Sequence, residues 1–503
     1  MDTAKKKRQS LSAFTILVII LAVVCLVSFF VNGAQISDNI IKTLDPEKYQ
    51  KLLDIVDSGK HVQVVGAGVS DFMMAIPNGF TDAADLLMFI IALGGFLGIV
   101  MKTGALEAGV NHLVHKMHGR EEVLIVILMI LFSLGGTTYG MAEETIGFYA
   151  LITSAMVMAG FDTVVALSTV LVGSASGVLG STINPFATGA AMGALSSVGI
   201  EPDKTLVYII GAILWVTSTG IGILFTLRYA KKVKRDKGST ILSLQEQEDM
   251  NTHFSTESAT KLPFTGRHKG VLIVFALCFV VMIASLISYQ DLIFHGDEDA
   301  FLAAFGWSKY LTGKPLGWWY FLELASWFIL GSVVIAIIGG FNEHSYIETF
   351  IDGAKDLLSV GLIIAVSRGI TVVMANTHLD FWILDKCTQL LQGVPGLIFV
   401  PMSYIVYILL SFLVPSTSGL AGLSMPIMGG LAQQLSFNPS IMVNIFSAGS
   451  GVVNMVTPTS GVVMGGVAAS HVQYSTYFKW VFKLLIMIAI ANVIVLTVSE
   501  MIW

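Results

Sequence analysis

The chain of 503 residues is 54% hydrophobic and only 12% charged, and its mean hydropathy is +0.78. This composition excludes an ordinary soluble globular protein and is typical of a polytopic helical membrane protein. The net charge of −6 excludes little, because a membrane protein distributes its charges unequally between the two sides of the bilayer.

The sequence contains none of the short motifs that identify common enzymes and ATP-driven pumps: HExxH, GxSxG, GxGxxG after a strand, or a phosphate-binding loop. The three cysteines, Cys25, Cys278 and Cys387, are odd in number and are expected to be buried structural thiols. We therefore predict no catalytic residue and no organic cofactor. A coupling ion, Na⁺ or H⁺, stays open.

The N-terminal unit is predicted over residues 1–82. Lys5-Lys6-Lys7-Arg8 precede the apolar run 13–31, which is long enough to span a bilayer. No clear cleavage site follows this run, so we expect a retained helix with a cytoplasmic N-terminus rather than a signal peptide. Residues 32–80 are polar and mixed, and they are expected to form an external segment.

Residues 83–230 are predicted to form a first repeat. The run 83–103 returns to the cytoplasm, and 104–120 would lie along the membrane interface. The apolar runs 121–134 and 145–159 come next, separated by GGTTYG. Fourteen helical residues reach only about 21 Å, short of a bilayer core of about 30 Å, so we predict a re-entrant hairpin over 121–159 with its tip at 135–140.

The hairpin is followed by a predicted broken helix over 163–197, which unwinds around 177–185 at a run rich in glycine that ends in Asn184-Pro185. Non-helical backbone at membrane depth is tolerated only where protein covers it or water reaches it, so the break indicates a binding site. A cytoplasmic linker is predicted over 231–269, after the most basic run of the chain.

The second half is predicted to invert the first. Connecting helices occupy 270–352, and the run 270–289 has no counterpart in the first half, so it reverses the direction of the second repeat. This second repeat is expected over 353–503, with a hairpin at 396–433 and a broken helix at 440–470.

The repeat is supported by short matches in the same order. Asp85-Leu86-Leu87 matches Asp356-Leu357-Leu358, and Gly98-Ile99 matches Gly369-Ile370 at the same offset. VPSTSGLAGLSMPIMGG and GSGVVNMVTPTSGVVMGG resemble the two interrupted stretches of the first half. We therefore predict an all-α polytopic membrane protein of two inverted-topology repeats, each with a re-entrant hairpin and a broken transmembrane helix.

Four partial helix ends would then meet near the membrane midplane. Half-helix N-termini suit carboxylates, and unwound carbonyls with Ser and Thr hydroxyls suit Na⁺. The predicted ligands in the first half are Thr137, Thr138, Tyr139, Ser181, Thr182, Asn184 and Thr188, with a candidate Na⁺ site at Thr137-Thr138 and Ser181-Asn184. Those in the second half are Ser416, Thr417, Ser418, Asn454, Thr457, Thr459 and Ser460, with a second candidate Na⁺ site at Ser416-Ser418 and Asn454-Thr459. The alternative is that small polar residues only let helices pack closely.

Three charged residues depart from the repeat. Glu143 and Glu144 align with Gly422 and Leu423, and Arg368 aligns with Leu97. Intramembrane charges are unfavourable and usually mark a pathway or a ligand, so we add these three residues to the site. The alternatives are a helix cap for the acids and a salt bridge or carbonyl clamp for the arginine. Of the two acids we expect Glu144 to face the ligand, with Glu143 as the cap.

The strings GGFLGIVMKTGAL, GGTTYGMAEET and STINPFATG resemble motifs of bacterial arginine/ornithine antiporters, which belong with the anaerobic C4-dicarboxylate carriers in the ion-transporter superfamily. The resemblance extends over nearly the whole chain and is strongest at 83–230. It implies a scaffold domain, a mobile transport domain, a bacterial cytoplasmic membrane location and a homodimer.

The leading functional prediction is a secondary carrier that exchanges cationic amino acids such as arginine and ornithine by alternating access. The close alternative is a Na⁺- or H⁺-coupled C4-dicarboxylate carrier, in which Arg368 pairs with the substrate. A channel is a remote alternative, because it needs a continuous polar path. The expected partners are a small-molecule substrate and the lipid bilayer, without nucleic acid.

Overall fold

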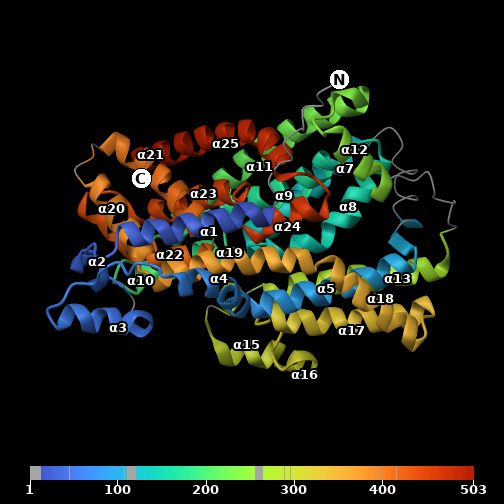
Figure 1. The fold of residues 1–503 in the computed structure, drawn as a ribbon, viewed down its shortest axis with the longest axis horizontal. Helices are drawn as coiled ribbons and strands as arrows, with labels where there is room; N and C mark the ends of the chain where they lie inside the picture. The colour runs from blue at the N-terminus through green and yellow to red at the C-terminus, as the bar shows by residue number, and fades with distance from the viewer. Residues whose placement is uncertain are drawn as a thin grey trace, which may run out of the picture.

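The computed structural model describes residues 13–44, 46–106, 108–109, 121–254, 264–287, 289–294, 296–392, 394, 396–414 and 416–503. Over these residues the protein is all-helical, and one isolated β-bridge joins Gln35 to Gln63 (Figure 1). Seven of the described helices are long and apolar enough to cross a membrane, or eight if one bent pair is a single span. The chain is therefore a multi-span membrane protein. Lys5 to Arg8, most of 104–120 and part of the predicted linker lie outside the described residues.

The helices of the first half are α1 (Ala13–Phe30), α2 (Asp38–Lys42), α3 (Pro46–Asp57), α4 (Val69–Asp82), α5 (Ala84–Lys102), α7 (Glu121–Tyr139), a 3₁₀ turn at Glu143–Thr145, α8 (Ile146–Met158), α9 (Thr163–Gly180), a π-helical turn at Pro185–Gly189, α10 (Ala190–Ser196) and α11 (Lys204–Arg235).

The rest of the chain contains a 3₁₀ turn at Lys237–Ser239, α12 (Leu244–Phe254), α13 (Gly266–Leu286), α14 (Tyr289–Leu292), α15 (Glu298–Phe305), a 3₁₀ turn at Gly306–Ser308, α16 (Lys309–Thr312), α17 (Phe321–Gly339), α18 (Glu343–Asp356), α19 (Leu358–Asn376), α20 (Leu379–Leu391), α21 (Gly396–Leu413), α22 (Thr417–Gln434), α23 (Pro439–Asn454), α24 (Gly461–Ala469) and α25 (Tyr474–Ile502).

Two pairs of consecutive helices, α4–α5 and α18–α19, run antiparallel to each other: α4 packs on α19 and α5 packs on α18. The contacts are made by glycines: a Cβ on Gly98 would lie 2.8 Å from the Cα of Gly353, and one on Gly79 would collide with the α19 backbone. Small residues of this kind let membrane helices approach closely. Helix α17 packs on α5 and α13 on α17, which completes this layer along the lower part of Figure 1.

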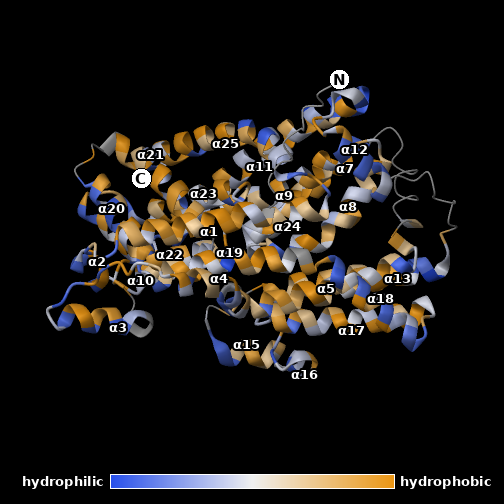
Figure 2. Cartoon of the chain, viewed as in Figure 1, coloured by the Kyte–Doolittle hydropathy of each residue, from blue (hydrophilic) through white to orange (hydrophobic). Residues whose placement is uncertain are grey.

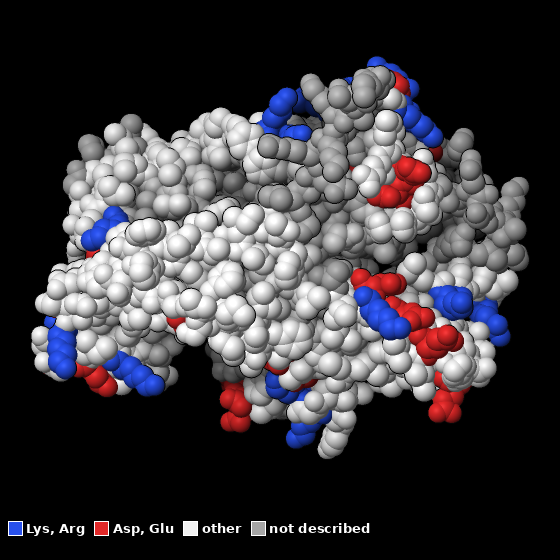
Figure 3. All heavy atoms as spheres, in the orientation of Figure 1, with Lys and Arg blue, Asp and Glu red and all other residues white. Residues whose placement is uncertain are grey.

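Most of the remaining long helices form a second layer around α9, whose residues are almost all buried, whereas α1 packs on α19 and α4. Helix α9 contacts α7, α8, α11 and α23, while α23 contacts α21, α22 and α25. Helix α19 links the two layers through α24. Figure 2 shows that apolar residues dominate the long helices, and in Figure 3 the surface over α1 carries almost no charged side chains. Such a surface suits contact with lipid.

Helix α7 does not end at residue 134, before the hairpin tip that we predicted at 135–140. Helix α7 continues to Tyr139 and has 19 residues, about 28 Å at 1.5 Å per residue, so it is long enough to span. Gly136 and Gly177 face each other, and a Cβ on either would collide with a carbonyl oxygen of the other helix. These glycines serve a close contact between α7 and α9 rather than a helix break, and α9 likewise stays helical to Gly180.

Candidate functional site

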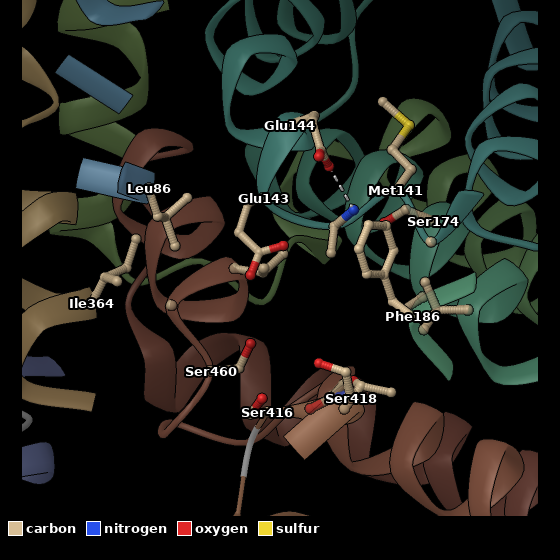
Figure 4. Close-up of a pocket in the computed structure, with 18 of the residues that line it drawn as sticks. Leu86, Met141, Glu143, Glu144, Ser174, Phe186, Ile364, Ser416, Ser418 and Ser460 are labelled. Atoms are coloured by element: carbon tan, nitrogen blue, oxygen red, sulfur yellow. Dashed lines mark hydrogen bonds between the residues drawn. The ribbon is translucent and has the colours of Figure 1, made fainter. Parts of the chain in front are cut away.

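A central cavity lies where four interruptions of the helices meet: those between α7 and α8, α9 and α10, α21 and α22, and α23 and α24 (Figure 4). One wall is closed by α19 and by the start of α17. The cavity leaves about 160 Å³ for the centres of water-sized molecules. Since one water needs roughly 10–15 Å³ on this measure, the space suits a small organic ion with a few waters.

The predicted site residues divide into two groups. Those that line the cavity are Glu143, Glu144, Asn184, Arg368, Ser416, Thr417, Ser418, Asn454, Thr459 and Ser460. Those that lie outside the cavity lining are Thr137, Thr138, Tyr139, Ser181, Thr182, Thr188 and Thr457.

The outlying residues of the first half mostly bond to one another. The Thr137 hydroxyl accepts from the Thr182 backbone N–H at 3.1 Å, and the Thr182 hydroxyl donates to the Thr137 carbonyl at 3.1 Å. Thr138 donates to the Leu134 carbonyl of its own helix, and Thr188 donates to the Ser181 carbonyl. These side chains satisfy backbone groups that the unwound segment leaves free, which is a structural role.

Asn184 holds the unwound segment in shape. Its side-chain oxygen accepts from the N–H groups of Phe186 and Ala187, at 2.9 and 3.3 Å, and its amide donates to the Ser181 hydroxyl at 3.1 Å. Gly140, at φ +78°, passes so close that a Cβ there would lie 2.7 Å from the same oxygen. Asn184 therefore fixes the unwound segment after α9, lies against Gly140 in the break after α7, and also lines the cavity. We call this role a clamp.

The two neighbouring acids have different surroundings, and the backbone bond that we expected at Glu143 is made by Glu144. The Glu144 carboxylate is buried and accepts from the Ala142 backbone N–H at 3.0 Å, as a cap does. In Figure 4 this carboxylate is directed at the Ala142 N–H, whereas the Glu143 carboxylate projects into the cavity. Consecutive residues of a helical turn differ in direction by about 100°, so both acids cannot face the same ligand.

The second-half cluster joins the breaks of the second half. The Asn454 amide donates to the Thr417 hydroxyl at 3.4 Å, and the Thr459 hydroxyl donates to the Phe412 carbonyl at 3.2 Å. The Thr457 and Thr459 hydroxyls are hydrogen-bonded at 2.7 Å, and Thr457 itself does not line the cavity. Among the described atoms, the Asn454 side-chain oxygen is buried without a hydrogen-bond partner, so it is available to a donor or a cation from the cavity.

Two helix N-termini open into the cavity. Ser416 is the N-cap of α22 and accepts from the Gly419 N–H at 3.3 Å, while Ser460 is the N-cap of α24 and its hydroxyl makes no capping bond. Ser416, Ser418 and Ser460 lie together in Figure 4, across the cavity from Glu143. The free N–H groups and the helix dipoles at this wall suit an anionic group.

Arg368 lines the same cavity from α19. Its Nε lies 4.0 Å from a carboxylate oxygen of Asp82, and the two side chains are 32% and 48% exposed. An ion pair this long and this open is weak, so Arg368 keeps most of its capacity to bind another anion. The neighbouring Ser367 donates to the Thr459 carbonyl, which joins α19 to the break between α23 and α24.

Three aromatic residues of the lining were not predicted: Phe186, Tyr320 and its neighbour Phe321. Phe186 follows the unwound turn, and Tyr320 precedes α17; their ring centroids are 5.9 Å apart. Phe186 lies inside the motif STINPFATG and could have been found from its place after the break. Tyr320 lies in the segment GWWYF, and no local pattern relates it to the cavity.

Among the described residues, no group of three or more His, Cys, Asp or Glu side chains could hold a metal ion. The hydroxyl and amide oxygens at the four breaks are the ligands that an alkali cation would need.

Comparison with known proteins identifies the family. Residues 11–501 match the sequence model described as the C4-dicarboxylate anaerobic carrier, DcuC, and the chain therefore belongs to this family. It is 27% identical over 539 residues to an uncharacterized protein of Haemophilus influenzae, covering 99% of both chains. It is also 27% identical over 411 residues to YfcC of Escherichia coli K12, whose name proposes a basic amino acid antiporter; the match covers 80% of this chain and 74% of YfcC.

Two solved structures are distantly similar. The YdaH transporter of Alcanivorax borkumensis aligns with a TM-score of 0.43 and 14% identity, covering 97% of both chains. MtrF of Neisseria gonorrhoeae, described as one of a class of antimetabolite efflux pumps, aligns with a TM-score of 0.41 and 15% identity over 98% of this chain and 95% of its own.

Proposed function

We propose that this member of the carrier family is a secondary active transporter that exchanges cationic amino acids, of the arginine or ornithine type, by alternating access. The observation that carries the proposal is the separation of opposite charges on different walls of the central cavity. Glu143 projects from one wall, whereas Arg368 and two helix N-termini occupy other walls. A basic amino acid carries a carboxylate at one end and a cation at the other, which matches this distribution of charge.

The acidic pole has no equivalent in the second half, where Gly422 and Leu423 take the places of Glu143 and Glu144. The half-buried Glu143 carboxylate has the exposure that a ligand needs, while Glu144 is occupied by the backbone of Ala142. A cationic side chain would therefore bind at Glu143 and leave the structural bond of Glu144 in place.

The anionic pole is suited to the α-carboxylate. Arg368 presents a planar guanidinium that can bind both carboxylate oxygens, and its present partner Asp82 lies at 4.0 Å. The N-termini of α22 and α24 add uncharged donors beside it. The name of YfcC, a relative over most of this chain, supports the same class of substrate.

Alternating access would follow from two inverted repeats, which we also propose. The packing of the two halves supports this: α7 on α9, α9 on α11 and α7 on α11 have the counterparts α21 on α23, α23 on α25 and α21 on α25. The antiparallel pairing of α4–α5 with α18–α19 has the form that a two-fold axis in the membrane plane would produce. A cytoplasmic N-terminus in a bacterial inner membrane belongs to the same proposal.

The second candidate is a C4-dicarboxylate carrier coupled to Na⁺ or H⁺. It is favoured by the family description and by the presence of an arginine and two helix N-termini in one cavity. The unpartnered oxygen of Asn454, beside Thr417, would then contribute to a Na⁺ site, and the glutamates would carry protons.

Uptake of labelled arginine into proteoliposomes tests the proposal. The vesicles are preloaded with ornithine, with succinate or with buffer alone. Exchange predicts arginine uptake only into the ornithine-loaded vesicles. Equal uptake into all three would indicate a channel. Succinate uptake driven by a Na⁺ or proton gradient, without any arginine exchange, would establish the dicarboxylate carrier instead.

A further inference from the structure

We propose that Phe186 and Tyr320, together with Glu143, form a subsite for a planar, delocalised cation, the guanidinium group being the ligand that fits it. This inference rests on the proposed function, because it specifies which end of a cationic substrate binds where. It adds two residues that are distant in the sequence to the recognition site.

The two rings meet within the cavity lining. Their centroids are 5.9 Å apart and their planes are tilted by 40°, so the rings are neighbours that do not stack face to face. The Phe321 ring also lies against Tyr320, 4.3 Å away between centroids. Phe186 is half-buried and Tyr320 is 42% exposed, which leaves part of each ring open to a ligand. Tyr320 also lies within electrostatic reach of Glu143, Glu144 and Arg368. Aromatic faces and a carboxylate therefore converge on one part of the cavity.

The backbone N–H of each of the two aromatic residues makes a hydrogen bond to a side chain. The Phe186 N–H donates to the Asn184 side chain at 2.9 Å. The Tyr320 N–H donates to Glu323 at 2.8 Å, and Glu323 in turn pairs with Lys314 at 2.9 Å. Because the backbone at each ring is already fixed, a ligand would not have to order the backbone of the subsite.

The chemistry of the subsite distinguishes among cations. A cation over an aromatic face is attracted by the ring quadrupole, and the attraction increases where water is excluded. A guanidinium is planar and weakly hydrated, so it can lie on a ring and bind a carboxylate with two N–H groups at once. An ammonium is a compact, strongly hydrated charge and gains less from the same surface. We expect the rings to favour arginine over ornithine and over citrulline, its uncharged isostere.

The test is the affinity of the purified protein for L-arginine, ornithine, citrulline and methylguanidinium, each measured directly by titration calorimetry. The variants are Phe186→Leu, Tyr320→Leu and Tyr320→Phe. Phe437→Leu is the matched control, since Phe437 stacks on Phe399 and does not line the cavity. Both ring-removing variants should bind arginine about tenfold more weakly, equivalent to about 1.4 kcal/mol, while citrulline binding changes little. Tyr320→Phe and Phe437→Leu should stay close to the wild type.

Arginine affinity that is unchanged in both leucine variants would overturn the subsite. An equal loss for arginine and citrulline would overturn it too, because the rings would then only shape the cavity. If the wild type binds methylguanidinium in a ring-dependent way but does not bind arginine, the subsite stands and the proposed substrate falls. If the wild type binds neither, both are wrong.

Discussion

At the residue scale, a backbone hydrogen bond separates the roles of two adjacent acids. Glu144 accepts from the Ala142 N–H, and this bond occupies its buried carboxylate. Glu143 makes no comparable cap and projects into the cavity (Figure 4). The ordering of the two along the chain favoured the opposite assignment, because Glu143 lies nearer the end of α7.

The two acids therefore make a direct prediction. Glu143→Gln should weaken arginine binding on the order of 30-fold or more, since losing a charge-assisted contact in a desolvated site typically costs about 2–5 kcal/mol. Glu144→Gln should have little effect, because the amide oxygen still accepts from Ala142. The control is Glu122→Gln. Glu122 lies at the start of α7, pairs with Lys231 and does not line the cavity. The affinity of each variant for arginine is measured by titration at one pH and one salt concentration. Equal affinity in all three variants would contradict a cationic ligand at Glu143.

Asn184 provides a second prediction at this scale. Replacement by Leu should lower the unfolding temperature of the substrate-free protein as well as abolish transport, because the N–H groups of Phe186 and Ala187 lose their acceptor. Each buried donor left unsatisfied costs about 1–3 kcal/mol. Thermal unfolding in detergent measures this effect. A variant with the melting temperature of the wild type and no transport would mean that Asn184 acts as a ligand and not as a clamp.

At the element scale, the glycines of α7 and α9 determine how the first half packs. Gly136 and Gly177 bring the two helices so close that a Cβ on either meets the carbonyl oxygen of Ser174 or Ser133. The interface excludes side chains, and α7 remains helical through Gly136 to Tyr139, although GGTTYG predicted a break at this place. Close packing of small residues supplies the stability here.

Gly177→Ala is thus expected to destabilise the protein by about 1–3 kcal/mol, even though alanine is the better helix former. Gly193→Ala in α10 is the matched control, because nothing lies within 4 Å of its Cβ position. Its stability should be unchanged or slightly increased. Unfolding temperatures of the two variants make the comparison, and a Gly177→Ala protein as stable as Gly193→Ala would show that the helices can separate without loss.

At the scale of the whole molecule, the cavity draws its walls from both layers. Glu143 comes from the first half, Ser418 from the second, and Arg368 from α19, which links the layers through α24. A site built in this way changes whenever the layers move against each other, as alternating access requires.

Thiol labelling of Ser418→Cys tests that movement. The native Cys25, Cys278 and Cys387 are buried, so background labelling should be low. A membrane-impermeant reagent should modify the new thiol from one side of the membrane at a time, and saturating arginine should slow the reaction. Labelling from both sides at equal rates, with or without arginine, would indicate a continuous pore instead.

Composition and hydropathy were sufficient to predict a helical membrane protein with polar interruptions, because a chain in lipid must satisfy its backbone locally and reveals its helices as apolar runs. Much of the candidate site could also be predicted, since Ser416, Asn454 and Arg368 stand out as polar residues in apolar surroundings. Only the tertiary structure decided that Gly136 packs instead of breaking a helix, that Glu143 faces the cavity, and that Tyr320 reaches Phe186. These three outcomes depend on contacts between segments that are far apart in the sequence or on the direction of a single side chain, and local pattern carries no information about either.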